Sequence, residues 1–397
     1  MASRYAGLVP GSVIVAGART PIGKLSGALS SFSAAQLGGF AVEAALQRSG
    51  VAPDQVDYVI MGQVLMAGAG QVPARQAASA AGVPMTTPAT VVNKVCLSGL
   101  NAIYQADLMI SAGDADIVVA GGMESMSNAP HLLVGARRGY RLGGTEVRDS
   151  LIYDGLEDAR THESMGRDTE GYLHRFPAVT RERQDAFAAE SHERAARATK
   201  EGLLAQEIVP VETGGGAVEA DEGIRPGTTV ESLASLRPAF AEGGSITAGN
   251  ASQISDGASA VVVASSAAAA RLGVEPLGTV LGYGMVAGPD TSLMTQPSRA
   301  ALSALGRAGL SVKDVSLFEI NEAFAAVALA AMDDLGVGAE VVNPNGGAVA
   351  LGHPLGASGN RIALTLLHEL RRRGGGVGVA ALCGGGGQGD ALVVRAG

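Results

Sequence analysis

"RSGVAPDQVDYVIMG" (48–62) and "RAGLSVKDVSLFEIN" (307–321) are two copies of one pattern, and together they decide the fold class. Each copy ends a helical run with Arg-x-Gly, restarts at an aliphatic residue and then enters a short strand-like run. A long pattern that returns after such an interval indicates an internally duplicated chain.

The duplication extends on both sides of these copies. "VVN" at 91–93 recurs at 341–343, and Ser98-Gly99 at the start of a helical pattern recurs as Ser358-Gly359. Each helical pattern is followed by an apolar run that ends in glycines, "ADIVVAGGMES" (115–125) and "GVGVAALCGGGGQG" (376–389). Short apolar runs that alternate with helical patterns are typical of βαβ elements around a buried sheet. We therefore predict two similar α/β halves packed together.

Residues 126–254 differ in character, because they are rich in Arg, Glu and Asp and contain turn signals such as "GGTEVRDS" (143–150). We interpret them as an inserted loop domain. This assignment leaves residues 1–125 plus 255–276 as the N-terminal half and 277–397 as the C-terminal half. Within the insertion, Thr180 is the expected N-cap of a helix over "RERQDAFAAESHERAARA" (181–198).

Composition limits the possible partners and compartments. The 397 residues are 47% hydrophobic and 17% charged, which is typical of a soluble globular α/β protein of more than one unit. A net charge of −9 argues against a nucleic-acid surface or an acidic membrane as partner. The N-terminus lacks the features of a signal peptide, and no run of about 18 apolar residues occurs. We expect a cytoplasmic protein.

Cys96 and His353 are the first candidates for chemistry. Cys96 stands just before the helical pattern that begins at Ser98, and a helix N-terminus or an adjacent imidazolium lowers the pKa of a thiol. The second copy of the repeat carries a longer, glycine-rich segment, which contains His353, between "VVN" and Ser-Gly. If the halves pack about a pseudo-twofold axis, the two turns meet, and a nucleophile lies beside a base. Alternatively, Cys96 is a small buried hydrophobic residue and His353 a turn histidine that bonds its own backbone.

Cys383 and Asn321 end two further buried strand patterns. Cys383 is followed by Gly384 to Gly387, whose uncovered backbone N–H groups can form an oxyanion site. Asn321, in "NEAFAA" (321–326), can fix a water or a carbonyl group. The alternatives are a buried strand-end cysteine and an asparagine that caps a helix.

Five motifs in register resemble the thiolase family: "NKVCLSG", "AGNAS", "NEAFA", "GGAVALGHPLGASG" and "CGGGGQG". The resemblance runs from "ARTPIG" (18–23) to the C-terminus. It implies the thiolase fold, two α-β-α-β-α halves about a pseudo-twofold axis, and a Claisen exchange of acyl groups between coenzyme A thioesters. It favours joining two acetyl-CoA into acetoacetyl-CoA and CoA, and the reverse. No metal or prosthetic group is implied.

The resemblance also implies roles for individual residues. Cys96 is the expected nucleophile that takes the acyl group, His353 the base that activates it, and Cys383 the acid/base acting on the second acyl-CoA. Asn321 is expected to hold a water for one oxyanion hole, and the backbone N–H groups of Cys96 and Gly385 to form another. The expected coenzyme A contacts are Ser252, Leu156, Met165, Ser164 and, near the adenine, Arg225.

The sequence departs from the common family pattern at three positions. Ser164 stands where many short-chain members have a histidine, Val327 where glutamine is common, and Pro344 where valine is usual. These departures concern chain-length preference and coenzyme A affinity rather than the catalytic positions.

Four other functions remain open at this stage. They are a thiolase for longer 3-ketoacyl chains, a decarboxylating ketoacyl synthase, a catalytically silent acyl-CoA-binding scaffold and a redox dithiol formed by Cys96 and Cys383. The resemblance further implies a homotetramer (a dimer of dimers), or at least a dimer, with residues 125–143 as a candidate assembly loop.

Overall fold

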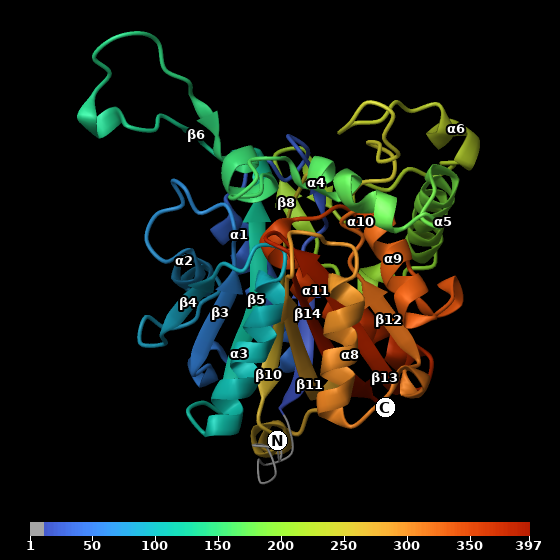
Figure 1. Cartoon of the computed structure of the whole chain (residues 1–397). Coiled ribbons are helices and arrows are strands. Elements are labelled where there is room, and N and C mark those ends of the chain that lie inside the picture. The colour runs from blue at the N-terminus through green and yellow to red at the C-terminus, as the bar shows by residue number, and fades with distance from the viewer. Residues whose placement is uncertain (1–11) are drawn as a thin grey trace.

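A computed structural model describes residues 12–397, and one ten-stranded mixed sheet runs through it (Figure 1). The strand order is β12-β13-β14-β11-β1-β10-β5-β3-β4, with β2 paired to β10. β1 and β11 are antiparallel and meet at only two residue pairs, Val13 with Thr279 and Ile14 with Gly278. This short contact joins two sheets of the same design into one.

In the strand order of the sheet, the first half contributes β1, β10, β5, β3 and β4, together with β2 beside β10. Its elements are β1 (Val13–Arg19), β2 (Gly23–Lys24), α1 (Ala34–Ser49), β3 (Tyr58–Gly62), α2 (Pro73–Ala80), β4 (Ala89–Val92), α3 (Ser98–Ala112), β5 (Ile117–Ser125), β10 (Ser255–Ala264) and α7 (Ser266–Leu272). The second half comprises β11 (Gly278–Ala287), α8 (Gln296–Ala308), β12 (Leu317–Ile320), α9 (Ala325–Leu335), α10 (Ala348–Leu351), α11 (Leu355–Arg372), β13 (Gly376–Gly384) and β14 (Gln388–Ala396).

The two halves match strand by strand, which confirms the predicted duplication. Outward from the β1–β11 contact, each half has two antiparallel pairings and then a parallel pairing, and the first half adds a second parallel pairing, that of β3 with β4. In both copies of the quoted pattern a helix ends at a left-handed glycine, Gly50 after α1 and Gly309 after α8. A short 3-10 turn and then a strand follow in each, β3 in one copy and β12 in the other.

The helices α3 and α11 pack against each other in the centre of the molecule. Leu100 and Ile103 of α3 share one buried cluster with Ile362 and Leu366 of α11. The two Ser-Gly pairs of the repeat face each other at this contact. A Cβ at Gly99 would lie 2.9 Å from the Asn360 nitrogen, and one at Gly359 would lie 2.5 Å from the Leu100 nitrogen. Glycine is therefore required where the two helices cross.

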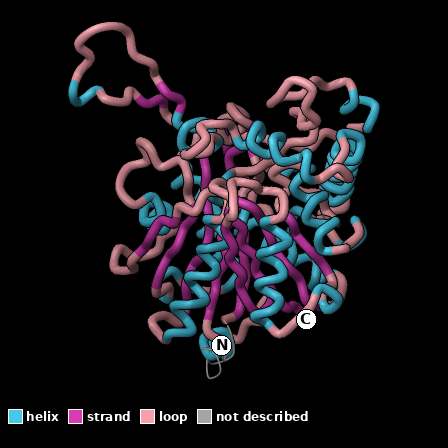
Figure 2. Tube along the Cα trace, in the orientation of Figure 1, coloured by secondary structure: helices cyan, strands magenta, loops and turns pink. Residues whose placement is uncertain are grey.

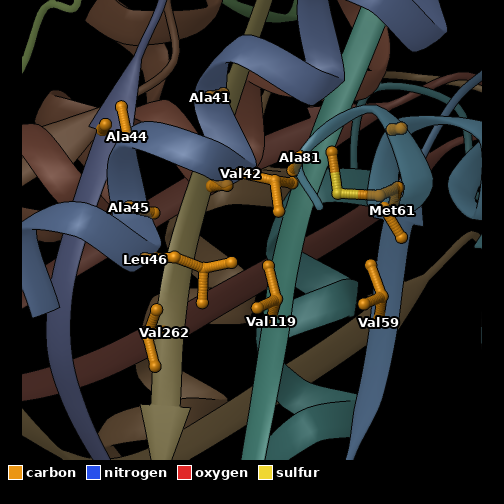
Figure 3. Close-up of a cluster of buried hydrophobic side chains, with 14 of the residues drawn as sticks. Ala41, Val42, Ala44, Ala45, Leu46, Val59, Met61, Ala81, Val119 and Val262 are labelled. Carbon is orange, nitrogen blue, oxygen red and sulfur yellow. The ribbon is translucent and has the colours of Figure 1, made fainter. Parts of the chain in front are cut away.

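A second apolar core lies on the other face of the first half (Figure 3). The buried face of α1 presents Val42 and Leu46 toward Val59, Val119 and Val262 of strands β3, β5 and β10. The β-branched residues suit the strands, and the alanine-rich α1 approaches them closely.

The segment between β5 and β10 lies across one end of the sheet (Figure 1). It mixes loops with short elements and one long helix (Figure 2). Its elements are β6 (His131–Leu132), β7 (Arg148–Asp149), a π-helical turn (Leu151–Leu156), α4 (Met165–Tyr172), α5 (Arg181–Lys200), β8 (Val211–Thr213), β9 (Gly216–Val218) and α6 (Val230–Ala234). As predicted, Thr180 caps α5, because its hydroxyl accepts a hydrogen bond from the Arg183 nitrogen at 3.4 Å. The boundaries proposed for the three domains stay a prediction.

Candidate active site

The turn that carries Cys96 lies between β4 and α3, and several bonds fix its shape. Val95 adopts a φ of +51°, which is unfavourable for a β-branched residue. Ser98 opens α3, as predicted, and its hydroxyl accepts from the Lys94 nitrogen at 2.8 Å and donates to the Val95 carbonyl at 2.6 Å. The half-buried Cys96 is therefore presented on a constrained turn at a helix N-terminus.

The Cys96 sulfur lies against the glycine turn of the other half. Burial raises the pKa of Cys96 to about 12, while hydrogen bonds from the backbone N–H groups of Cys96 and Gly385 favour the thiolate more weakly. The sequence led us to expect a lowered pKa from the helix N-terminus. That expectation was wrong, because desolvation outweighs the helix terminus here. The resting group is a neutral thiol.

His353 follows α10 and is 5% exposed. Its Nδ1 lies 2.6 Å from the Ser358 hydroxyl, which itself donates to the Pro354 carbonyl at 2.9 Å. Since that hydroxyl has a single proton, we assign Nδ1 as the donor to Ser358, which leaves the lone pair on Nε2. Within residues 12–397, Nε2 has no hydrogen-bond partner. Burial, with a smaller contribution from Arg361, lowers the pKa of His353 to about 3, so the imidazole is neutral and the lone pair on Nε2 is free to accept a proton.

Cys383 is the penultimate residue of β13 and is 1% exposed. Burial raises the pKa of Cys383 far above its usual range, and the neighbouring Cys96 thiol raises it further. The two sulfurs thus lie close enough to interact. The turn after Cys383 needs glycine, because Gly387 has a φ of +65° and a Cβ there would lie 2.0 Å from the Asp290 carbonyl oxygen.

Asn321 follows β12 and is fully buried. The helix α9 begins only at Ala325, with Phe324 as its N-cap, so Asn321 does not cap a helix. Neither its side-chain nitrogen nor its side-chain oxygen has a hydrogen-bond partner among the described residues. A buried amide of this kind is a ready partner for a water or a substrate oxygen.

A pocket of about 380 Å³ opens beside His353. Four of the predicted coenzyme A contacts line it: Leu156, Ser164, Met165 and Ser252. Met165 Sδ would also lie 3.7 Å from a Cβ at Gly385, and Leu355 both lines the pocket and packs in the cluster that Cys96 contacts. The pocket therefore leads toward the two turns.

Arg225 lies outside the lining of this pocket. It is exposed, and its backbone N–H donates to Nδ1 of His192 at 3.1 Å.

The three residues that depart from the family pattern have structural contacts of their own. Ser164 is the N-cap of α4, because its hydroxyl accepts from the Arg167 nitrogen at 3.3 Å. Val327 of α9 is buried in an apolar cluster that also contains Phe324 and Cys383. The Pro344 carbonyl accepts a hydrogen bond from the Arg197 side chain at 2.7 Å.

Sequence reasoning missed Glu124, the penultimate residue of β5. Its fully buried carboxylate accepts hydrogen bonds from the backbone nitrogens of Val64 at 2.9 Å, Leu65 at 3.0 Å and Gly356 at 2.9 Å. Burial raises the pKa of Glu124 to about 7. Glu124 ties the start of α11, three residues after His353, to the loop after β3. Its only sequence signal was an acidic residue at the end of an otherwise apolar strand.

A duplicated α/β fold with two neighbouring cysteines and a neutral histidine beside one pocket is the arrangement of an acyl-transferring enzyme. The profile of the thiolase N-terminal domain matches residues 12–267, and that of the thiolase C-terminal domain matches residues 274–396. The chain belongs to the thiolase family.

Two curated relatives and one solved structure cover nearly the whole chain. The chain is 56% identical to a probable acetyl-CoA acetyltransferase of Mycobacterium leprae, over 97% of this chain and 99% of the relative. It is 49% identical to an acetyl-CoA acetyltransferase of Chromobacterium violaceum, over 96% and 98%. The crystal structure of the Bacillus anthracis acetyl-CoA acetyltransferase matches with a TM-score of 0.94 at 39% identity, over 98% of this chain and 99% of that one.

None of the helices in residues 12–397 is both long and apolar enough to cross a membrane. The cytoplasmic location stays a prediction.

Proposed function

We propose that this enzyme condenses two acetyl-CoA into acetoacetyl-CoA and CoA, and catalyses the reverse cleavage, through an acyl group carried on Cys96. The observation that carries the proposal is the meeting of Cys96 with the Cys383–Gly387 turn, beside the pocket that His353 lines. The names of the full-length relatives support acetyl-CoA as the substrate.

The protonation states suggest how Cys96 is acylated. Both Cys96 and His353 are neutral at rest, because burial raises one pKa to about 12 and lowers the other to about 3. A preformed thiolate–imidazolium pair is therefore absent, and the thiol proton moves to Nε2 as sulfur attacks the thioester carbon. The N–H groups of Cys96 and Gly385 are suited to receive the oxyanion. Collapse then leaves an acyl-cysteine and expels the CoA thiolate.

Cys383 is suited to the second step. Its raised pKa makes it a neutral thiol at rest, so it must lose a proton before it can act as a base. The departing CoA thiolate can take that proton, which leaves CoA as a thiol and Cys383 as a thiolate. This thiolate removes a proton from the methyl carbon of the second acetyl-CoA, and the enolate attacks the acyl group on Cys96. The proton on His353 returns to Cys96 as acetoacetyl-CoA forms.

Asn321 offers an oriented partner for the enolate oxygen, either directly or through a water, because its buried amide group is otherwise unpaired within residues 12–397. Coenzyme A thioesters are the only small molecules this scheme needs, so we propose that no metal or prosthetic group takes part. Leu156, Ser164, Met165 and Ser252 are proposed to contact the pantetheine arm. Arg225 stays a candidate for the nucleotide end, outside the pocket.

Two cysteine variants separate this proposal from its rivals. Cys96→Ala is expected to abolish acetyl transfer, and Cys383→Ala to abolish condensation while Cys96 still accepts an acetyl group. If condensation survives in Cys383→Ala but not in Cys96→Ala, the role of Cys383 is wrong and a decarboxylating synthase is favoured. Wild-type protein that binds acetyl-CoA but transfers no acetyl group to Cys96 would favour a silent acyl-CoA-binding scaffold.

Chain length is decided by thiolysis of 3-ketoacyl-CoA substrates of increasing length. The rings of Phe240 and Phe324, both in the pocket lining, meet edge to face with centroids 5.9 Å apart. We expect this pair to limit the acyl end to short chains. A higher kcat/KM for chains longer than four carbons would favour the alternative of a fatty-acid-degrading thiolase.

A protruding segment supports the proposed oligomer. Residues 131–149 stand away from the rest of the molecule (Figure 1). This segment exposes five large hydrophobic side chains: Leu133, Val134, Tyr140, Leu142 and Val147. Exposed apolar surface of this kind is typical of a subunit contact. We propose that it joins two dimers into a homotetramer.

A further inference from the structure

Lys94 joins the turn that carries Cys96 to the opposite half of the molecule. Its ammonium nitrogen lies 2.7 and 2.8 Å from the two carboxylate oxygens of Asp390. The Asp390 side chain is fully buried, and that of Lys94 is 21% exposed. Asp390 is in β14, where it pairs with Leu382 of β13, the residue before Cys383. The Lys94–Asp390 ion pair therefore links the turn that carries Cys96 to the paired strands β13 and β14, the first of which carries Cys383.

Asp390 is itself held in place. The Tyr283 hydroxyl of β11 donates to its Oδ2 at 2.5 Å. The Tyr283 ring stacks on Tyr104 of α3, with centroids 4.3 Å apart and planes 10° from parallel. Since α3 is the helix that follows Cys96, this stack is a second link between the two halves at the same level. The Asn101 side chain of α3 also hydrogen-bonds Asp390, so the buried carboxylate is a rigid anchor for Lys94.

The turn needs an anchor because its local conformation is unfavourable. Val95, between Lys94 and Cys96, has the positive φ already described, and such a conformation persists only where surrounding bonds over-determine it. On the side of the first half the turn is held by Ser98. Toward the second half, the bonds that hold it are the Lys94–Asp390 pair and the Gly385 N–H to the Cys96 sulfur.

We propose that Lys94 and Asp390 are a positioning pair that sets the separation of the two reacting sulfurs, Cys96 and Cys383. The proposal rests on the proposed function, in which acylation of Cys96 is served by His353 but condensation needs both sulfurs in register. Weakening the pair then slows the second half-reaction more than the first, because acylation uses only the Gly385 N–H of the Cys383–Gly387 turn, whereas condensation also needs the Cys383 sulfur. A pair that merely stabilised the fold would affect both half-reactions alike.

The test compares the two half-reactions in the same variants. Acylation is followed by exchange of labelled CoA into acetyl-CoA, and the complete reaction by thiolysis of acetoacetyl-CoA. The main variant is Lys94→Met/Asp390→Asn, which removes both charges and so leaves no buried charge unpaired. Tyr283→Phe is a milder variant that keeps the ring stack. Lys313→Met is the matched control at an exposed lysine.

We expect CoA exchange in the double variant to stay within about threefold of wild type, while kcat for thiolysis falls about 100-fold, since a misplacement near 1 Å costs about that much. Tyr283→Phe is expected to shift the same ratio several-fold, and Lys94→Arg to restore part of the lost thiolysis. Equal loss of both half-reactions, or no loss of either, would overturn the positioning role. Wild-type enzyme that is inactive in both assays would instead refute the proposed function, and this proposal with it.

Discussion

Gly122→Ala tests whether close backbone packing under α11 sets the position of His353. Gly122 is in β5, and a Cβ there would lie 1.9 Å from the Gly356 carbonyl oxygen, 2.7 Å from its carbon and 2.9 Å from the Ala357 Cα. All three are backbone atoms, so no side chain can turn away. Real Cβ atoms essentially never approach below 3.0 Å, so the start of α11 must move by about 1.1 Å.

The displacement has two measurable consequences. Overpacking of a filled core costs about 1–3 kcal/mol, and we expect the upper end because backbone must move. His353 precedes Gly356 by three residues, so it shifts with the helix. A shift of about 1 Å in a reacting group costs about 100-fold in rate. We therefore expect the free energy of unfolding to fall by about 3 kcal/mol and kcat/KM to fall about 100-fold.

Urea unfolding followed by circular dichroism measures the first effect, and thiolysis of acetoacetyl-CoA by the folded protein measures the second. Gly306→Ala in α8 is the matched control, because a Cβ there meets no atom within 4 Å. It is expected to raise stability by about 0.5–1 kcal/mol, since alanine favours a helix interior over glycine. A Gly122→Ala enzyme with wild-type stability and activity would refute the packing argument.

Three further predictions follow from the site. The rate of Cys96 alkylation by iodoacetamide is expected to rise about tenfold per pH unit from about pH 6 to pH 9, because a pKa near 12 keeps the thiolate fraction growing; a plateau near pH 7 would contradict the raised pKa. Glu124→Gln is expected to lower the free energy of unfolding by about 2 kcal/mol in urea titrations, since an amide cannot accept from all three backbone N–H groups; unchanged stability would show that these bonds contribute little. Replacement of residues 133–147 by a short Gly-Ser linker is expected to convert a tetramer into a dimer by light scattering, and an unchanged mass would exclude this segment as the assembly contact.

The fold could be predicted because the sequence motifs that specify it are local and occur once in each half. Arg-x-Gly before an aliphatic restart fixes the left-handed ends of α1 and α8 at Gly50 and Gly309, whatever surrounds them. Ser98 likewise marks the start of α3, but the prediction for Ser358 was wrong, because α11 begins three residues earlier, at Leu355. Even the second "VVN" behaves like the first, since Val342 forms a parallel bridge to Phe318 of β12 as β4 pairs with β3.

The individual ion pairs and hydrogen bonds between distant residues could not be predicted. The Lys94–Asp390 pair joins residues from different halves, and neither residue type stands out in its own segment. Glu124 resembles a strand end until three backbone N–H groups converge on it. The prediction of a lowered pKa for Cys96 was wrong for the same reason. The helix N-terminus is visible in the sequence, but the desolvation that outweighs it is set by the whole fold.

The duplication also accounts for how one symmetric scaffold holds two unlike reactive groups. Ser98 and Ser358 occupy equivalent positions, and each hydroxyl donates to a carbonyl of the turn before its helix, that of Val95 in one half and that of Pro354 in the other. The same device therefore constrains both turns. Because the second turn is longer, its serine can also accept from Nδ1 of His353, which assigns the free lone pair to Nε2. A pair of equivalent serines thus fixes the thiol of one half and the tautomer of the imidazole in the other.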